Sequence, residues 1–548
     1  MKEFFEKYKT QLMILGAVIV TYFLYFHNLW GYKLLDVDET RYVDMARCMH
    51  KTKDFMTLYL NGQYFFEKPP LYFWLENLSF TIFHTVNEFV ARIPTCIEGI
   101  IASLALFFAT KKYTKNLKLA ILSSLILLTS AEFVILSKIA ILDILLASTV
   151  TLSILAGFMT FSCQENHKKY YWWAFYLFSA LAVLAKGIPG IALPFGTMFF
   201  AGIYTKKLKE FFRLQYLLVG FALFLLISLP WHIIMLNQYD PLFFNEYIIK
   251  HHVARFMGAD VIHRQQPFWF YMPVILWGIL PFAASFIAML VEKCAKIKGF
   301  KYQKFAEISE KQQFLNLCII ATLVVFFFFS TSGTKLVTYI LPIFPYLAVL
   351  LGNYWLEYVE NDEHKKGISI STYIFYGILI FAAVVFPIVV LFLKDPVKSD
   401  LLTILIPTLI TLTVFPILGL IALKREKKYM LFLSFVLFMA FLSGFGFHKI
   451  LEMNYRFGEN DLVKYAQYAK DNGLKIYTYQ TGARYSLLYY SQDNVKFNLE
   501  DDENLSFEEV INNPENIVIV RKKHFDELPM KDFEILDTGR KYMMLYKK

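Results

Sequence analysis

The sequence has 548 residues and a mass of 64.2 kDa; 57% of its residues are hydrophobic and only 18% are charged. Soluble domains are closer to about 45–50% apolar and about 25% charged, so the composition excludes a disordered chain, a coiled coil and a disulfide scaffold, and it argues against a soluble enzyme. The excess of Lys and Arg over acidic residues gives a net charge of +10. In a membrane protein such an excess is typical of cytoplasmic loops rather than of a nucleic-acid partner.

Apolar runs long enough to cross a bilayer recur along the chain. The first, residues 11–30, follows a cationic N-terminus and has no small-residue cleavage site after it, so we interpret it as an uncleaved span. Together the runs predict about thirteen transmembrane helices in an all-α polytopic membrane protein. The later runs lie near 92–110, 117–133, 138–160, 170–185, 188–204, 213–236, 268–291, 313–330, 336–356, 368–393, 399–423 and 429–447.

Alternate short connectors are rich in cations and are therefore expected on the cytoplasmic side. With an odd number of spans, the N-terminus is then cytoplasmic and the C-terminus periplasmic. We expect a transmembrane domain over residues 1–447, with two periplasmic loops at 31–91 and 237–267. The cationic connectors contain Lys111, Lys112, Lys115 and Lys118; Lys206, Lys207, Lys209 and Arg213; Lys293, Lys296, Lys298, Lys301 and Lys304; and Lys424, Arg425, Lys427 and Lys428.

Residues 448–548 predict a small periplasmic α/β domain. Helical spacing covers 461–471 and ends before Gly473, while 475–479 and 517–520 have the composition of strands. Ser506 and Glu509 form the pattern of a helix capping box. A docking or stabilising role is favoured over a catalytic one for this domain.

The first outer loop opens with Asp36, Asp38, Glu39 and Arg41, directly after a span. The residues that follow have amphipathic helical spacing, which predicts a helix on the membrane surface with Asp38 as its cap. The cluster is either a hydrated helix start or a site for a polar headgroup. Asp36 and Asp38 also form a D-x-D pair typical of nucleotide-sugar enzymes, but an outer loop does not meet cytoplasmic nucleotide sugars.

A second amphipathic helix is expected to begin near Pro69, because proline suits the first helical turn. Lys68 then lies beside the free N–H groups of that turn, where a phosphate would bind at the bilayer surface. The alternative is a lysine that extends its ammonium to the interface without binding a ligand.

The second outer loop contains His251, His252 and Arg255. If the segment is helical, His252 shares a face with Arg255, and so does His251. A basic cluster on the outer side opposes the usual charge distribution, and Arg255 suits bidentate phosphate binding. A metal held by Glu67 and a histidine is a weaker hypothesis, because a third ligand is not defined.

Four charged residues lie at the ends of spans on the same side as these loops. Charges at such positions are costly and usually face a cavity. Their coincidence predicts one polar cavity that opens outward. They are Lys138, Asp143, Lys186 and Lys335.

At these residues the sequence resembles a known family, the multi-span glycosyltransferases of superfamily C that use polyprenyl-phosphate sugars. It is most similar to the bacterial lipid A 4-amino-4-deoxy-L-arabinose transferases, relatives of the protein O-mannosyltransferases. The Glu-Lys-Pro-Pro and Lys-Leu-x-Thr-Tyr motifs are the most specific. The matching segments are 38–42, 66–71, 185–190, 252–256 and 335–342, together with Asp143.

The resemblance implies roles residue by residue. It places Asp38 at the reaction centre, with Glu39 and Asp143 as further catalytic candidates. It assigns the donor phosphate to Lys68, Arg255 and Tyr339, and the rest of the cavity to Arg41, Lys186 and Lys335. It places a divalent metal, if one is used, on Glu67 and His252.

The expected function is therefore transfer of an amino sugar from undecaprenyl phosphate to a lipid A phosphate, at the periplasmic face of a bacterial inner membrane. Such an enzyme belongs to lipopolysaccharide modification and polymyxin resistance, and its partners are lipids rather than nucleic acid. An alternative acceptor is a protein or another glycan, for which Asp38 would act as a general base. A transporter is a weaker alternative, because transporters usually contain repeats and broken helices near mid-membrane.

Overall fold

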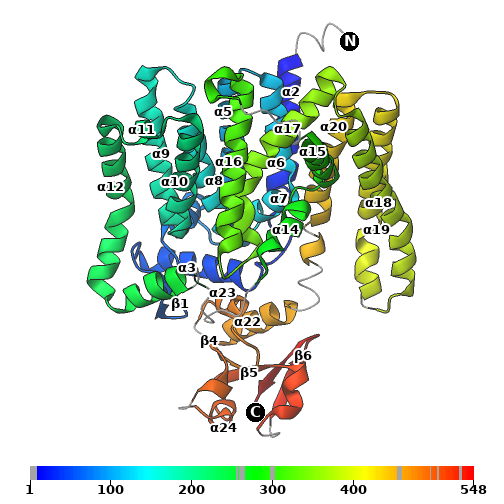
Figure 1. Cartoon of the computed structure of the whole chain (residues 1–548). Helices are drawn as coiled ribbons and strands as arrows, with labels where there is room; N and C mark the ends of the chain where they lie inside the picture. Colours follow the sequence, from blue (N-terminus) through cyan, green and yellow to red (C-terminus); the bar gives the residue numbers. More distant parts are fainter. Residues whose placement is uncertain are drawn as a thin grey trace.

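This computed structural model describes residues 9–254, 257, 266–296, 303–395, 397–447, 449–452, 459–493, 495–502, 505–529 and 533–547. A bundle of long helices carries a small α/β domain at one end (Figure 1), which confirms the predicted fold class. Among the described residues, seven helices are long and apolar enough to cross a membrane, or eight if the bent pair α6–α7 is one span. The predicted number of about thirteen spans stays a prediction.

The helices of the bundle follow the predicted apolar runs in chain order. Up to the second outer loop they are α2 (Lys9–Thr21), η1 (Tyr22–Phe26), α5 (Glu88–Thr114), α6 (Leu117–Thr129), α7 (Ala131–Ser137), α8 (Asp143–Met159), α9 (Glu165–Lys186), α10 (Pro189–Thr205), α11 (Leu208–Phe211) and α12 (Leu214–Tyr239). From that loop onward they are η2 (Phe244–Ala254), η3 (Phe268–Phe270), α14 (Tyr271–Gly278), α15 (Ala283–Lys296), η5 (Phe305–Glu307), α16 (Glu310–Thr331), η6 (Val337–Ile343), α17 (Phe344–Asn361), α18 (Lys365–Phe392), α19 (Val397–Lys424), α20 (Lys428–Phe441) and η7 (Leu442–Phe447).

Two of the predicted continuous runs are broken. The run at 117–133 bends by 62° between α6 and α7, and the run at 268–291 is divided between α14 and α15 around Pro281, which has no N–H to donate. The two breaks lie beside each other, because the N–H of Ala131 donates to the carbonyl of Leu280 over 3.0 Å. This one hydrogen bond gives a partner to a backbone N–H at the first break and to a backbone carbonyl at the second.

The first outer loop folds into α3 (Asp38–Thr52), the strands β1 (Tyr59–Leu60) and β2 (Gln63–Tyr64), and α4 (Leu71–Phe83). Both predicted helices of this loop are present. The apolar face of α3 packs against α4 and the C-terminal domain instead of lying free on a membrane surface. Asp38 is the first residue of α3 rather than its cap; it pairs with Arg41 at 2.9 Å.

A fully buried ion pair fixes this loop to the bundle. Arg92 on α5 donates from Nε to Glu39 Oε1 over 2.7 Å, and both side chains are 0% exposed. The carboxylate also accepts from the N–H groups of Leu35 and Ala140, while the guanidinium donates to the carbonyl of Leu29. Glu39 was expected among the catalytic residues. The structure instead places it in a buried hydrogen-bond network that holds the first outer loop on the bundle.

The C-terminal domain is a five-stranded mixed sheet in the order β4-β3-β5-β7-β6. Helices α22 and α23 pack on one face and α24 on the other. The predicted helix, both predicted strands and the capping box of Ser506 and Glu509 are present. Its elements are α22 (Asn460–Asn472), β3 (Lys475–Tyr479), α23 (Tyr485–Ser491), β4 (Val495–Lys496), η8 (Leu499–Asp501), α24 (Phe507–Ile511), β5 (Asn516–Arg521), η9 (Lys522–Glu527), β6 (Glu534–Thr538) and β7 (Tyr542–Tyr546).

This domain is docked on the first outer loop. Asp36 accepts from the N–H and the hydroxyl of Ser486, at 3.0 and 2.7 Å. Asn61 exchanges two hydrogen bonds with the backbone of Val495, at 2.7 and 2.9 Å. Asp36 therefore serves the domain contact while Asp38 pairs with Arg41, so the two carboxylates of the D-x-D pair do not share a metal position.

We expect Glu39→Gln to lower the free energy of unfolding by about 3–5 kcal/mol, because Arg92 would then be a buried charge without its ionic partner. Thermal unfolding of the detergent-purified protein measures this. The matched control is Glu310→Gln, which breaks the exposed pair with Lys115 and should cost less than about 1 kcal/mol. Equal stability losses in the two variants would contradict the anchoring role.

We expect the docking of the C-terminal domain to weaken as the pH rises. Burial and the nearby Asp36 raise the pKa of Glu459 to about 6, although Arg484 and Lys541 act in the opposite direction. The pKa of Glu459 in the folded chain therefore exceeds its value in the unfolded chain, which is about 4.3. The stability that protonated Glu459 contributes is complete below about pH 4.3 and is lost as the pH rises through about 6.

Limited proteolysis of the link between the two parts should therefore be slower at about pH 5 than at about pH 7. Each rate is corrected for protease activity on an unfolded substrate. Glu459→Gln should remove most of the pH dependence. A wild-type chain that is cleaved equally fast at both pH values would refute the coupling.

Candidate active site

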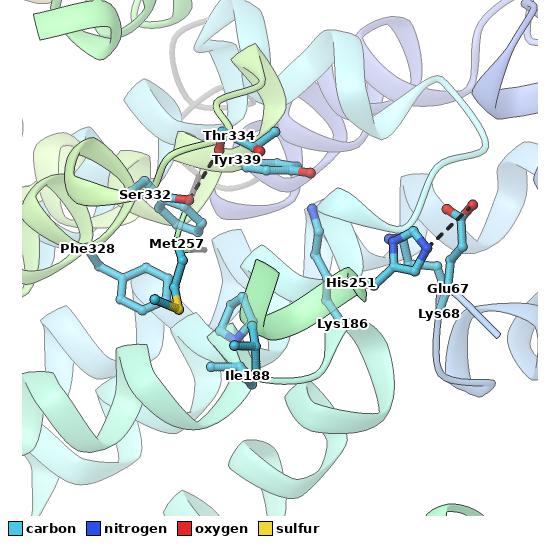
Figure 2. A pocket seen from close by; sticks show the side chains of 13 residues that line it. Glu67, Lys68, Lys186, Ile188, His251, Met257, Phe328, Ser332, Thr334 and Tyr339 are labelled. Carbon is cyan, nitrogen blue, oxygen red and sulfur yellow. Dashed lines mark hydrogen bonds and ion pairs between the residues drawn. The ribbon is translucent and has the colours of Figure 1, made fainter. Parts of the chain in front are cut away.

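A cavity of about 330 Å³ lies where the first outer loop meets the ends of α9, α16 and η2 (Figure 2). Cationic and acidic side chains occupy one part of its wall, and aliphatic and aromatic side chains form the rest. It is lined by Glu67, Lys68, Lys186, Ile188, Pro189, His251, Val253, Met257, Phe328, Phe329, Ser332, Thr334 and Tyr339. Four of the predicted site residues thus share one cavity: Glu67, Lys68, Lys186 and Tyr339.

Two lysines supply positive charge to this cavity. Lys68 is 8% exposed and precedes α4. Lys186 is the last residue of α9, which ends because Gly187 takes a positive φ and Pro189 begins α10. Figure 2 shows the Lys186 ammonium between Tyr339 and the pair formed by His251 and Glu67.

The Lys186 ammonium has two described partners. It forms an ion pair with Asp143, the first residue of α8. It also lies 4.1 Å from the centre of the Tyr339 ring, a cation–π distance. Asp143 therefore orients Lys186 at the edge of the cavity, and an anionic ligand would meet a cation that is already positioned.

A chain of alternating charges leads from the cavity to the exposed start of α3. Arg41 lies 2.9 Å from Asp38 and 3.6 Å from Glu67. Glu67 in turn lies 3.9 Å from Nε2 of His251. The Asp38 side chain is 58% exposed, so it stands where a ligand could approach from outside while Glu67 faces inward.

Of the predicted metal pair of Glu67 and His252, the structure describes only the Glu67 side chain. The imidazole described beside Glu67 belongs to His251, whose Nε2 is also 3.7 Å from Glu246. These carboxylates do not converge with the ring into a three-ligand cluster among the described residues. The side chain of His252 and the whole of Arg255 lie outside the described residues.

Two of the predicted span-end charges, Lys335 and Lys138, form hydrogen bonds with backbone carbonyl groups. The Lys335 ammonium donates to the carbonyls of Ser332 and Gln266, at 2.6 and 2.9 Å, and burial lowers the pKa of this lysine. It thereby supports the loop whose Ser332 and Thr334 line the cavity. Lys138 donates to the carbonyl of His27 and is not among the cavity residues.

A further buried carboxyl group was not singled out by the sequence analysis. Glu132 on α7 is 1% exposed, and neither of its oxygens has a hydrogen-bond partner among the described residues. It packs directly on Gly278, where an added Cβ would lie 2.5 Å from the carboxylate. A lone acidic residue in the apolar run 117–133 was the available signal.

The sequence is similar to a family model and to several known proteins. Residues 10–243 match the family model described as dolichyl-phosphate-mannose-protein mannosyltransferase. A relative from Proteus mirabilis, the undecaprenyl phosphate-alpha-4-amino-4-deoxy-L-arabinose arabinosyl transferase 2, is 27% identical over 70% of this chain and 67% of its own length. The corresponding transferase 1 of Sodalis glossinidius is 28% identical over 64% of this chain and 60% of its own. These matches confirm the predicted family resemblance.

A crystal structure of ArnT from Cupriavidus metallidurans bound to undecaprenyl phosphate superposes with a TM-score of 0.77 at 18% identity, over 98% of this chain and 97% of that one. This chain has the ArnT fold. An archaeal oligosaccharyltransferase from Archaeoglobus fulgidus is more distant, with a TM-score of 0.54 at 11% identity over 95% of this chain and 70% of that one. With its membrane-spanning helices and these relatives, the chain is a multi-pass membrane protein.

Proposed function

We propose that this protein transfers 4-amino-4-deoxy-L-arabinose, or a closely related amino sugar, from undecaprenyl phosphate to a phosphate of lipid A. The observation that carries the proposal is the cavity in which Lys68, Lys186 and Tyr339 meet in an ArnT fold. The names of the curated relatives supply the sugar and the carrier lipid.

The two parts of the cavity wall suit the two parts of such a donor. Ile188, Met257 and Phe328 give an apolar wall for the isoprenoid chain, and the lysines face the place for a phosphate. Bond cleavage between the sugar and the carrier leaves a second negative charge on the carrier phosphate. Preorganised cations stabilise a charge that develops in the transition state, and Lys68 and Lys186 are such cations. Arg255 is proposed as a third.

The acceptor is proposed to approach from the exposed side of Asp38. An acceptor phosphate is already an anion, so its oxygen attacks the anomeric carbon without a general base while the bond to the carrier phosphate breaks. In this reaction Asp38 and Arg41 orient the reactants, the carboxylate through a polar or amino group and the guanidinium through a phosphate. Asp143 acts through Lys186 as a positioning residue.

A divalent cation is not needed for these steps. If one binds at the cavity, Glu67 and His251 are the residues placed to hold it, with His252 as a further ligand from sequence, and it would add positive charge beside the donor phosphate.

We further propose that the cavity faces the periplasm of a bacterial inner membrane. The cation-rich connector that contains Lys115 and Lys118 pairs with Glu310 of α16 and Glu360 of α17, at the end of the bundle opposite the C-terminal domain (Figure 1). Cationic connectors favour the cytoplasm, and this supports a periplasmic position for the cavity and the C-terminal domain.

Mass spectrometry of lipid A tests the acceptor. Expression of the chain in a strain that makes the lipid-linked amino sugar but lacks its own transferase should add one amino-sugar mass to lipid A phosphates. The matched control expresses Lys68→Ala at the same level. Unmodified lipid A together with a sugar on protein or on another glycan would refute lipid A as the acceptor.

Two substitutions separate donor binding from acceptor orientation. We expect Lys68→Ala to cut turnover by on the order of a hundredfold, as the loss of one charge-stabilising donor does, and to weaken retention of the undecaprenyl-linked donor. Asp38→Asn should abolish most turnover yet retain the donor. Lys33→Ala, in the same loop but paired with Glu88, should remain active. Wild-type turnover in Lys68→Ala would refute the phosphate assignment.

A further inference from the structure

A second cluster of ionisable side chains lies at the opposite end of the bundle from the cavity, where α17 turns into α18 (Figure 1). Its centre is His364, whose side chain is 5% exposed. Three carboxylates surround this one imidazole, from Glu292 on α15, Glu357 on α17 and Glu363 in the turn. The proposed reaction uses none of these residues.

The two ring nitrogens have different surroundings. Nδ1 lies 2.5 Å from Oε2 of Glu292, so a proton on Nδ1 is shared with a carboxylate. Nε2 lies 3.0 Å from Oε2 of Glu357 and 3.9 Å from Oε2 of Glu363. A histidine that gives one N–H to a carboxylate and turns the other nitrogen toward further carboxylates has the arrangement of a metal ligand with its outer partner.

The separations suit a small divalent cation. Bonds of about 2.0–2.1 Å at tetrahedral angles place neighbouring ligand atoms about 3.4 Å apart, between the two distances measured from Nε2. One ligand atom each from His364, Glu357 and Glu363 all lie within 4.8 Å of one another, the one such group among the described residues.

An outer layer of hydrogen bonds fixes these ligands. Tyr354 donates to Glu292 over 3.0 Å and stacks on the His364 ring at 4.3 Å. Asn353 donates to Glu357 over 3.0 Å, and its own Oδ1 is buried without a described hydrogen-bond partner. His364 itself has a φ of +60°, an uncommon backbone conformation for a residue other than glycine.

The charge of the cluster also favours a cation. Three carboxylates face one imidazole, and the lysines that act on Glu357 are Lys293 and Lys311, the latter at 3.7 Å. A cluster that served only as an ion pair would need one carboxylate for one imidazolium. We propose that His364, Glu357 and Glu363 form a structural binding site for a divalent transition metal of the zinc class, with Glu292 as the outer partner of the histidine.

Such a site would join α15, α17 and the start of α18. The pair α18–α19 has only 22% of each apolar segment buried within the chain, so most of its surface faces away from the bundle. A metal at the turn would tie the beginning of α18 to α15 and α17.

Isothermal titration of the detergent-purified full-length chain with Zn²⁺ tests the proposal. The protein carries His251→Ala, which removes the histidine at the cavity, and no polyhistidine tag. We expect one saturable Zn²⁺ equivalent that raises the thermal unfolding midpoint. Glu292→Gln should weaken binding by about 10–100-fold, as expected for an outer-layer partner, and His364→Ala should abolish it.

Glu363→Gln keeps the proposal falsifiable if the buried variants fail to fold, because that side chain is 55% exposed. It should weaken Zn²⁺ binding and remove the zinc-dependent rise in the midpoint, while the metal-free midpoint stays within the error. The matched control is His524→Ala, which breaks another His–Glu pair at 2.9 Å and should bind Zn²⁺ normally. Absence of saturable binding, or unchanged binding in Glu363→Gln, would overturn the proposal.

Discussion

The buried pair of Glu39 and Arg92 is the contact on which the working end of this protein depends. It joins α3 to α5, and the Glu39 carboxylate also accepts from Ala140, just before α8 begins. The same network therefore sets the position of Asp38, one residue away on α3, and of Asp143 on α8. A charge pair in a water-free interior requires complete hydrogen bonding, and this requirement gives the loop one conformation.

From this anchor the charges alternate outward. Arg41 stands between Asp38 and Glu67, and Lys186 stands between Asp143 and Tyr339. Opposite charges that are already paired need little rearrangement when an anionic ligand enters, which is the condition for electrostatic catalysis. The apolar remainder of the wall lowers the polarity around Lys68, which is 8% exposed, and so strengthens its effect on a phosphate.

The C-terminal domain contributes to the same end through Asp36. Because Ser486 binds this carboxylate, the domain contacts the loop two residues before Asp38. The docking or stabilising role expected from sequence thus has a defined contact. A change in docking would first alter the conformation at the start of α3. The proposed metal site lies at the other end of the bundle, on α17 and α18, so we expect loss of the metal and loss of the proposed sugar transfer to be separate events.

The sequence by itself determined the membrane class, the positions of nearly all long helices and the residues Lys68, Lys186 and Tyr339 of the cavity. Runs of apolar residues and charges at their ends suffice for the helices and for Lys186, since a bilayer permits few alternatives. Lys68 was indicated by the helix start expected near Pro69, and Tyr339 by the family resemblance. It also located the helix, two strands and capping box of the C-terminal domain, because those signals are local.

Only the tertiary structure decided the exposure and the ion-pair partners of neighbouring charged residues. Asp38 and Glu39 are adjacent, yet one is exposed beside Arg41 and the other is buried on Arg92. Successive residues of a helix point about 100° apart, so Asp38 meets Arg41 of its own helix while Glu39 meets Arg92 of α5. The broken spans, His251 beside Glu67 and the isolated Glu132 were likewise not predicted. Each depends on which helix ends meet, and a local pattern of residues does not contain that information.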